Sequence, residues 1–262
     1  ELGIPLKKNV RLILGTDEEC GSSDIRHYYS IEKEAPMTFS PDAEYPLVNT
    51  EKGRFPGHFT AGFEASDALP RLVSIKAGTK VNVVPGKTKA AVEGFEMAAL
   101  EKAAAETKEE TGISFEFAAE GTVTEITATG IGAHASTPDV GNNALTGLLV
   151  FLGKLDFASC PQVDMVRKTA SLFPHGDVNG KTLGVAMEDE LSGNLTLSFN
   201  MLSVDAASMD GEFDGRIPVC GNDENVLEVV RARMAEQGLT LLNKALIPPH
   251  HVSADSYFVK TL

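Results

Sequence analysis

A pattern of strand, amphipathic helix, glycine and strand occurs twice in this sequence. It spans residues 80–117, where the helical segment ends at Gly112, and residues 211–245, where it ends at Gly238. Glycine ends a helix readily because it adopts the left-handed backbone conformation without steric cost. An amphipathic helix that follows a half-exposed strand buries its apolar face against a sheet. The sequence therefore predicts an α/β (α+β) fold with two copies of a small sheet-plus-helix unit.

Other segments support the same fold class. Short runs in which apolar and polar residues alternate are typical of half-exposed strands, and longer segments have helical periodicity. The expected strands are 80–84, 113–117, 123–129, 194–203, 211–219 and 240–245, and the expected helices are 95–111, 144–155 and 224–237. We expect the repeat to cover roughly residues 80–160 and 194–247.

The beginning of the chain has a different pattern. Residues 10–14 (VRLIL) form a short apolar run of the kind that makes a buried, parallel strand. Residues 23–30 are predicted to form a helix capped by a serine, and residues 37–39 a second short strand. Open α/β sheets commonly form their binding sites at the carboxyl ends of such strands. Functional residues are therefore expected in the turns that follow them.

Charge and composition narrow the range of partners. The 262 residues include 23 Lys and Arg against 37 Asp and Glu, so the formal net charge is −14. Binding to nucleic acid or to an anionic membrane surface requires a basic face, so we expect neither. Three widely spaced cysteines indicate neither a disulfide framework nor a thiolate metal site. With no secretory signal and no apolar run long enough to cross a membrane, a soluble cytoplasmic protein is expected.

Three acidic residues and one histidine are candidates for chemistry. Glu18 and Glu19 follow the strand predicted at 10–14, and Asp42 follows a proline that restricts the backbone. Adjacent carboxylates on a turn can point in different directions, so that one binds a metal ion and the other acts as a general base. Taken alone, a solvated or turn-capping role explains each acid better. His134 lies in a loop of small residues, where a ligand-binding role and an ordinary loop histidine are equally good interpretations.

Five segments together resemble the M20 family of co-catalytic metallopeptidases, and within it the bacterial dipeptidases that act on Xaa-His and related dipeptides (PepV-like, carnosinase-like). The segments are LILGTDEECGSSD, FSPDAEYPLVNTEKG, KVNVVPG, GIGAHASTPDVGNNA and GEFDGRIPV. The stretch SPDAEYPLVNTEKG is the most specific, since it separates the dipeptidase branch from other M20 enzymes. The order and spacing of the segments agree across nearly the whole chain.

The resemblance implies a domain organisation. Residues 1–52 would be part of a zinc-peptidase-like α/β catalytic domain, and residues 53–247 a complete lid domain of two ferredoxin-like units. Residues 248–262 would begin the returning catalytic segment. Because one chain would supply both halves of the lid, the resemblance implies a monomeric enzyme.

The resemblance also implies a metal-dependent mechanism. Glu18 matches the general base, which takes a proton from a water held between two divalent metal ions, expected to be zinc, with manganese or cobalt as alternatives. Glu19 matches a terminal ligand of one ion, and Asp42 matches a ligand of the other.

Three residues of the expected lid match substrate-binding positions. His134 matches a histidine that stabilises the oxyanion formed from the scissile carbonyl. Asn82 matches a residue that contacts the substrate. Arg216 matches an arginine that pairs with the terminal carboxylate of a dipeptide, in a fork geometry that lysine does not reproduce.

The chain departs from the family pattern in its metal ligands. A His-x-Asp motif and a bridging Asp are expected before Glu18, and a late His after the lid, yet the sequence has no counterpart, since His250 and His251 come too early. We therefore expect an incomplete, inactive fragment of a dipeptidase. The alternatives are another M20 amidohydrolase (a deacylase or desuccinylase), a non-catalytic lid fragment, and a generic acidic α/β binding protein.

Overall fold

The chain consists of two compact units. The computed structural model describes residue 5 and residues 7–18, 21–41 and 45–262. Unit 1 comprises residues 1–48 and 255–262, and unit 2 comprises residues 49–254. None of the helices in the described ranges is long and apolar enough to cross a membrane. The expected domain boundaries after residues 52 and 247 stay a prediction about the parent protein.

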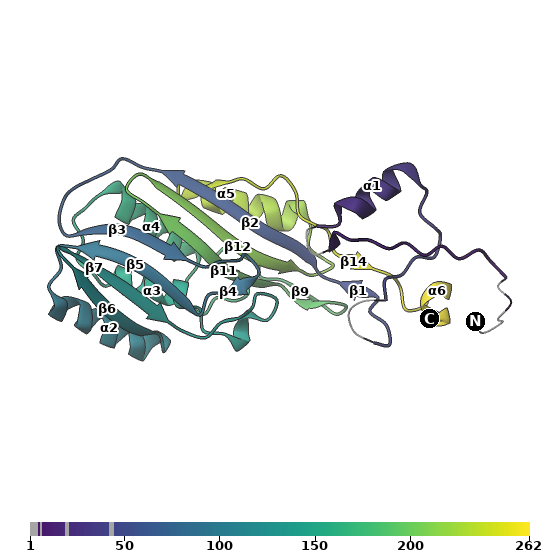
Figure 1. Cartoon of the computed structure of the whole chain (residues 1–262), viewed down its shortest axis with the longest axis horizontal. Helices are drawn as coiled ribbons and strands as arrows, with labels where there is room; N and C mark the ends of the chain where they lie inside the picture. The colour runs from purple at the N-terminus through teal and green to yellow at the C-terminus, as the bar shows by residue number, and fades with distance from the viewer. Residues whose placement is uncertain (1–4, 6, 19–20, 42–44) are drawn as a thin grey trace. The chain divides into compact units, whose positions relative to one another are not determined.

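An eight-stranded antiparallel sheet forms the centre of unit 2 (Figure 1). Each half of the sheet runs strand, helix, two hairpin-linked strands and helix along the chain, and the remaining strand lies beside the first. The fold is mixed α/β, as predicted, and the sheet includes two strands, at 53–62 and 71–77, that lie outside the repeat expected at 80–160 and 194–247. From edge to edge the strands are β13 (Thr240–Leu241), β2 (Gly53–Gly62), β12 (Ser208–Ile217), β11 (Thr196–Val204), β3 (Arg71–Ala77), β5 (Lys87–Glu93), β7 (Val123–Thr129) and β6 (Ser114–Glu120).

Helices cover one face of this sheet (Figure 1). Their apolar side chains and the inward residues of the strands form one continuous hydrophobic core. As predicted, α2 ends at Gly112, which has a φ of 75°. The helices are α2 (Met97–Thr111), α3 (Ala144–Gly153), α4 (Pro161–Leu172) and α5 (Glu228–Glu236), the last preceded by a π-helical turn at Asp223–Leu227.

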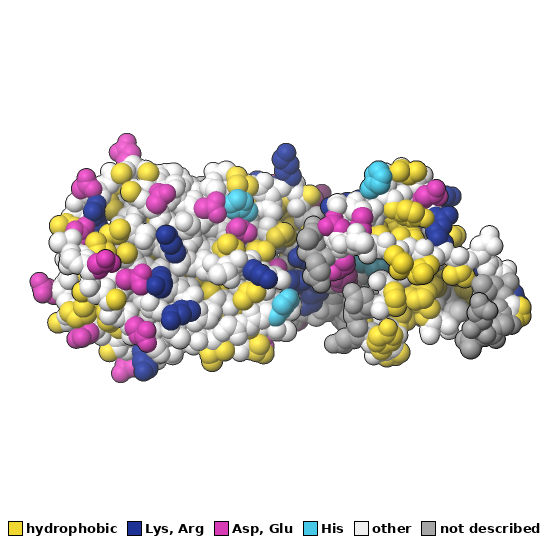
Figure 2. All heavy atoms as spheres, viewed as in Figure 1, with side chains coloured by type: hydrophobic (Ala, Val, Ile, Leu, Met, Phe, Trp, Pro, Cys, Tyr) yellow, Lys and Arg dark blue, Asp and Glu magenta, His cyan; other side chains and the backbone are white. Residues whose placement is uncertain are grey.

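The other face of the sheet is polar. Along β12 the outward residues are Asp210, Glu212, Asp214 and Arg216, while the residues between them lie in the core. Figure 2 shows acidic, basic and histidine side chains mixed on the visible surface of unit 2. A half-exposed antiparallel sheet is expected to alternate in this way.

Short ladders order the loops at the ends of the sheet. Each is antiparallel and has two residues on either side. The pairs are β1 (Thr50–Glu51) with β14 (His250–His251), β4 (Val83–Val84) with β8 (Ala133–His134), and β9 (Glu188–Asp189) with β10 (Gly193–Asn194). The strand predicted at 80–84 is therefore confined to β4, because the preceding residues form a turn.

Unit 1 corrects two predictions. The run at 10–14 is not a buried strand: it has no regular structure, and Val10, Leu12 and Leu14 are 75%, 80% and 81% exposed. Residues 37–39 are not a strand either. A strand requires a neighbour that satisfies its backbone groups, and the described residues of unit 1 contain no strand for these runs to pair with.

The described part of unit 1 contains two helices, α1 (Ser23–Ile31) and α6 (Tyr257–Thr261). The helix predicted at 23–30 is confirmed as α1, but no serine side chain caps it. Instead the carboxylate of Asp17 accepts hydrogen bonds from the Ser23 amide, at 2.9 Å, and from the Ser23 hydroxyl. These two bonds lower the pKa of Asp17 below its ordinary value.

Two phenylalanine rings lock β2 against β12. Phe213 lies opposite Gly57, and Phe59 lies opposite Gly211. Each ring covers the glycine across from it so closely that a Cβ on Gly57 would lie 2.0 Å from the Phe213 ring, and one on Gly211 would lie 2.3 Å from the Phe59 ring. Both rings are completely buried. Each aromatic ring therefore fills the space that a side chain at the opposite position would occupy.

We expect Gly57→Ala to lower the free energy of unfolding of this chain by about 2 kcal/mol, because the added methyl group overpacks the core. Urea denaturation measures the change. Gly153→Ala is the control, since a Cβ there meets nothing within 4 Å and alanine suits a helix better than glycine. Equal stability of the two variants would contradict the interlocked packing.

Candidate functional site

The predicted catalytic and metal-binding carboxylates belong to unit 1. Glu18 is exposed, in the turn that precedes α1. Glu19 and Asp42 lie outside the described residues, so their roles stay predictions. Within the part of the chain that is described, no group of three or more His, Cys, Asp or Glu side chains is arranged to hold a metal ion. The two predicted carboxylate ligands are too few for a two-metal centre, and the described residues add no cluster that would complete it.

The three predicted substrate-binding residues lie together in unit 2. The amide of Ala135 donates to the carbonyl oxygen of Asn82 at 3.0 Å, and His134 pairs with Val83 in the β4–β8 ladder. Arg216 pairs with Thr196 across the β11–β12 ladder. These residues come from three segments separated by 52 and 82 positions (134 − 82 and 216 − 134).

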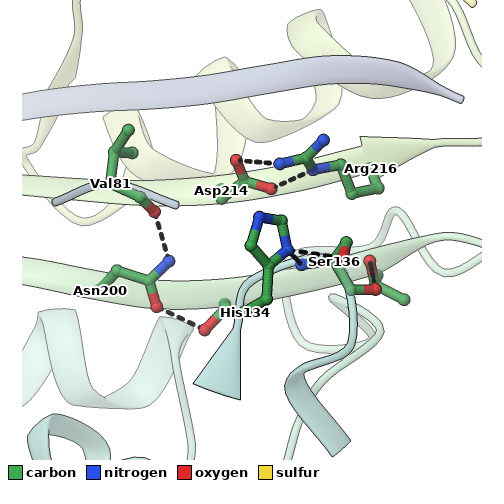
Figure 3. A network of polar contacts seen from close by, with 8 residues as sticks. Val81, His134, Ser136, Asn200, Asp214 and Arg216 are labelled. Carbon is green, nitrogen blue, oxygen red and sulfur yellow. Dashed lines mark hydrogen bonds and ion pairs between the residues drawn. The ribbon is translucent and has the colours of Figure 1, made fainter. Parts of the chain in front are cut away.

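A second contact joins the histidine to the strand pair that carries the arginine. The hydroxyl of Thr196 reaches the carbonyl oxygen of Ser136 at 3.5 Å, and Ser136 in turn binds His134 (Figure 3). The polar face of the sheet therefore brings the predicted residues of unit 2 into one region.

The hydrogen bonds of His134 select its tautomer. The backbone amide of Ser136 donates to Nδ1 at 3.2 Å, and the Ser136 hydroxyl lies 2.7 Å from the same nitrogen. An amide can only donate, so Nδ1 must accept and the ring proton belongs on Nε2. The side chain is exposed, so the Nε2–H group can donate to a ligand. Such a neutral imidazole donor is suited to stabilising a developing oxyanion.

Asp214 holds the side chain of Arg216. The Asp214 carboxylate is completely buried and accepts from Nε of Arg216 at 2.6 Å and from Nη2 at 3.2 Å (Figure 3). The two residues lie two positions apart on β12, so they project from the same face. This contact occupies one edge of the guanidinium group. The opposite edge, formed by the two terminal nitrogens, keeps donors for a second carboxylate.

Sequence reasoning missed Asp214 as a functional residue. The segment GEFDGRIPV contains the signal, since an acidic residue two positions before an arginine on a strand shares its face. Whether that carboxylate binds the arginine or points into solvent depends on burial, which one strand does not reveal.

A pinned hairpin lies next to the end of β12. The carboxylate of Asp189 accepts from the amide and hydroxyl of Ser192, from the amide of Leu191 and from the amide of Cys220, at 2.7–2.9 Å. Loss of solvent raises the pKa of Asp189, but these hydrogen bonds outweigh that effect and bring the pKa to about 2. The β9–β10 hairpin is therefore tied to the segment that follows Arg216.

An apolar cavity of unit 2 lies elsewhere. It has a volume of about 370 Å³ and is lined by residues of α3 and α4, including Leu149, Val166 and His175. Asn82, His134 and Arg216 do not line it. The polar sheet face, rather than this apolar cavity, gathers the predicted residues.

In the comparison with known proteins, no family model matches the chain, but individual relatives do. The chain is 34% identical over 269 residues to YtjP of Bacillus subtilis, whose name marks it provisionally as a dipeptidase, with 100% of this chain and 56% of the relative covered. It is 30% identical over 263 residues to a Beta-Ala-Xaa dipeptidase of Lactobacillus delbrueckii subsp. lactis, with 100% and 55% covered.

One solved structure gives a weaker match. Aminoacylhistidine dipeptidase from Vibrio alginolyticus aligns with a TM-score of 0.38 and 12% identity over 88% of this chain and 55% of that one. A score this low carries no conclusion about the site. The sequence matches confirm the resemblance to dipeptidases, and the chain spans just over half the length of these relatives.

We expect Arg216→Gln to lower the free energy of unfolding by about 3 kcal/mol, because it leaves the buried Asp214 carboxylate without a partner. Adding Asp214→Asn to this variant should restore part of the loss. Urea denaturation of the two single variants and the double variant measures the coupling. Arg54→Gln is the control, since Arg54 is exposed on the neighbouring strand opposite Arg216. Additive effects of the two substitutions would contradict the coupling.

The lowered pKa of Asp189 predicts that the stability of the fold depends on pH. Its folded-state pKa of about 2 lies below the ordinary 3.8, so the ionised carboxylate stabilises the fold above that range. This stabilisation is lost as the pH falls from 3.8 towards 2. We expect the difference in melting temperature between the wild type and Asp189→Asn to shrink over this interval. A constant difference would mean that the charge on Asp189 contributes nothing.

Proposed function

Because the chain is related along its whole length to proteins named as dipeptidases, we propose that its parent protein is a metal-dependent dipeptidase. Unit 2 would be the substrate-binding lid, and unit 1 part of the catalytic domain. The observation that carries this proposal is the convergence of Asn82, His134 and Arg216 on one polar sheet face, from three separate segments.

The substrate is proposed to be a dipeptide with a free carboxylate. The free edge of the Arg216 guanidinium would bind that carboxylate, and the half-buried Asn82 would contact the substrate backbone. The name of the Lactobacillus relative favours β-alanyl dipeptides, a class that includes Xaa-His substrates such as β-alanylhistidine. The Asp214–Arg216 ion pair has no net charge. Binding of one substrate carboxylate to Arg216 would therefore give the group of three a single negative charge.

In the proposed reaction Glu18 accepts a proton from the attacking water and later passes it to the leaving amine. His134 donates its Nε2 hydrogen bond to the oxyanion. Glu19 and Asp42 would act as ligands of divalent metal ions, zinc or alternatively manganese or cobalt. The ligand set is incomplete in this chain, so the remaining ligands would come from other parts of the parent protein, and the isolated chain would be inactive.

The partners follow from the fold. Both halves of the sheet belong to one chain, which supports a monomeric enzyme, since a second copy is not needed to complete the lid. The net charge of −14 argues against nucleic acid and anionic membranes as partners, and we propose a cytoplasmic location.

A second candidate is an amide hydrolase that acts on acylated amino acids, such as a deacylase or desuccinylase. It would use the same carboxylate recognition by Arg216. A panel of dipeptides and N-acyl amino acids, tested on the longest open reading frame that contains this sequence, separates the two. Hydrolysis of N-acyl amino acids in preference to dipeptides would overturn the dipeptidase proposal.

Within the full-length protein, we expect His134→Ala to lower kcat about 100- to 1,000-fold with little change in KM, because its donor acts on the transition state. His250→Ala, which removes an exposed histidine of β14, is the control. A loss confined to KM would assign His134 to ground-state binding instead.

In the same protein, Glu18→Ala should abolish hydrolysis while the bound metal content stays nearly intact, because a general base is not a ligand. Glu19→Ala should lower the metal content. Metal analysis of both purified variants measures this division of roles. Loss of metal from Glu18→Ala would make Glu18 a ligand and reverse the assignment.

A further inference from the structure

A β-bulge interrupts β11 next to the proposed substrate site. β11 pairs with β12 in regular register up to Phe199 and again from Met201, and Asn200 is the extra residue between them. Bulges re-aim a side chain and are frequent beside active sites. Asn200 is polar yet completely buried, so its hydrogen bonds must be satisfied within the protein.

The side chain of Asn200 reaches a segment 119 residues away. Its Nδ2 donates to the carbonyl oxygen of Val81 at 2.5 Å, and its Oδ1 accepts from the Ser198 hydroxyl at 2.5 Å (Figure 3). The Val81 carbonyl can only accept, so an amide suits this position and a carboxylate does not. Asn200 thereby fixes the residue directly before Asn82.

The segment at residues 78–82, which leads to Asn82, also packs closely against the bulge. Gly78 has a φ of 76°, and a Cβ there would lie 2.0 Å from the carbonyl oxygen of Asn200. Only glycine allows the turn to approach the bulge so closely. The segment that leads to Asn82 therefore has a tightly defined distance from β11.

Two further bonds extend this order to His134. Asn82 accepts from the Ala135 amide, and Val83 pairs with His134, so the turn carries the histidine segment with it. At the other end of that segment, the side chain of Asn143 donates to the carbonyl oxygen of Phe199 at 2.8 Å. The bulge thus anchors the histidine loop at both ends.

We propose that the bulge at Asn200 is the positioning element of the substrate site, and that it sets the spacing between His134 and Arg216. The idea rests on the proposed function. Arg216 is held by Asp214 on β12, while Asn82 and His134 are held through Asn200 on β11. The pairing of β11 with β12 then fixes the distance between the oxyanion donor and the carboxylate-binding arginine. This fixed distance acts as a ruler, which selects dipeptides over longer peptides.

Two variants test this role. Ser198→Ala removes the hydroxyl that holds the Oδ1 of Asn200 and adds no bulk. Asn200→Asp keeps the shape but replaces the donor to Val81 with an oxygen. Ser203→Ala is the matched control, because Ser203 is an exposed serine on the same strand. If Asn200→Asp fails to fold, Ser198→Ala carries the test.

The first measurement uses the chain as given. In Ser198→Ala we expect the Ala135 amide to exchange with solvent about five- to tenfold faster, as for the loss of one hydrogen bond, and the ring resonances of His134 to shift. The amide of Leu100 in α2 should be unaffected, which excludes global destabilisation. Unchanged Ala135 exchange and His134 resonances in the variants that fold would overturn the positioning role, whatever the parent protein hydrolyses.

The second measurement uses the full-length protein. Ser198→Ala should lower kcat/KM for a dipeptide about tenfold and reduce its preference over the matching tripeptide, with Ser203→Ala unchanged. An unchanged preference in an active enzyme would overturn the ruler. If the wild type hydrolyses no dipeptide while the exchange result holds, the proposed function fails and the positioning of His134 by the bulge stands.

Discussion

Pairing between β11 and β3 converts two four-stranded sheets into one. The contact is short, running from the Leu202–Ala77 pair to the Val204–Ile75 pair. Without this pairing, each half would have an additional edge strand with exposed backbone groups. Such an edge can pair with another chain and promote aggregation. With it, the sheet continues from β13 to β6 within a single polypeptide. The same strand carries the bulge at its middle, two residues before the joint, so the joint between the halves and the site depend on one element.

The polar face of the sheet contains side chains that a purely structural sheet would not need. Asn200 and Asp214 are both completely buried there, and burying amide and carboxylate groups has a desolvation cost. Both are satisfied by hydrogen bonds, and among the described residues no buried side-chain nitrogen or oxygen lacks a partner. Asn200 holds the Val81 carbonyl, which precedes Asn82, and Asp214 holds the Arg216 guanidinium. The cost of burial is therefore associated with fixing groups that can meet a ligand.

Unit 1 differs from unit 2 in how it is stabilised. Its described helices are short and bury no residue, and Val10, Leu12 and Leu14 of the apolar run are exposed. The order around Glu18 comes from local contacts, chiefly the capping of α1 by Asp17. The chain spans just over half the length of the relatives that it matches. A local turn can present a carboxylate, but a metal centre needs ligands from several segments.

The sequence by itself determined the helices whose periodicity and terminal glycines are local properties, such as α2 with Gly112 and α3 with its apolar run. It also indicated a mixed α/β fold and, through resemblance, Asn82, His134 and Arg216 as candidates, but it placed the strand before α2 at 80–84 instead of at β5. It missed β2, because Gly57 and Pro56 are typical of loops, and only the opposing Phe213 explains the glycine. It predicted strands at 10–14 and 37–39 that need neighbours to exist. Only the tertiary structure decided three features: the bulge at Asn200, the ion pair of Asp214 with Arg216, and which ring nitrogen of His134 carries the proton. Each depends on which groups surround a residue in the folded chain, and the sequence of one segment does not reveal them.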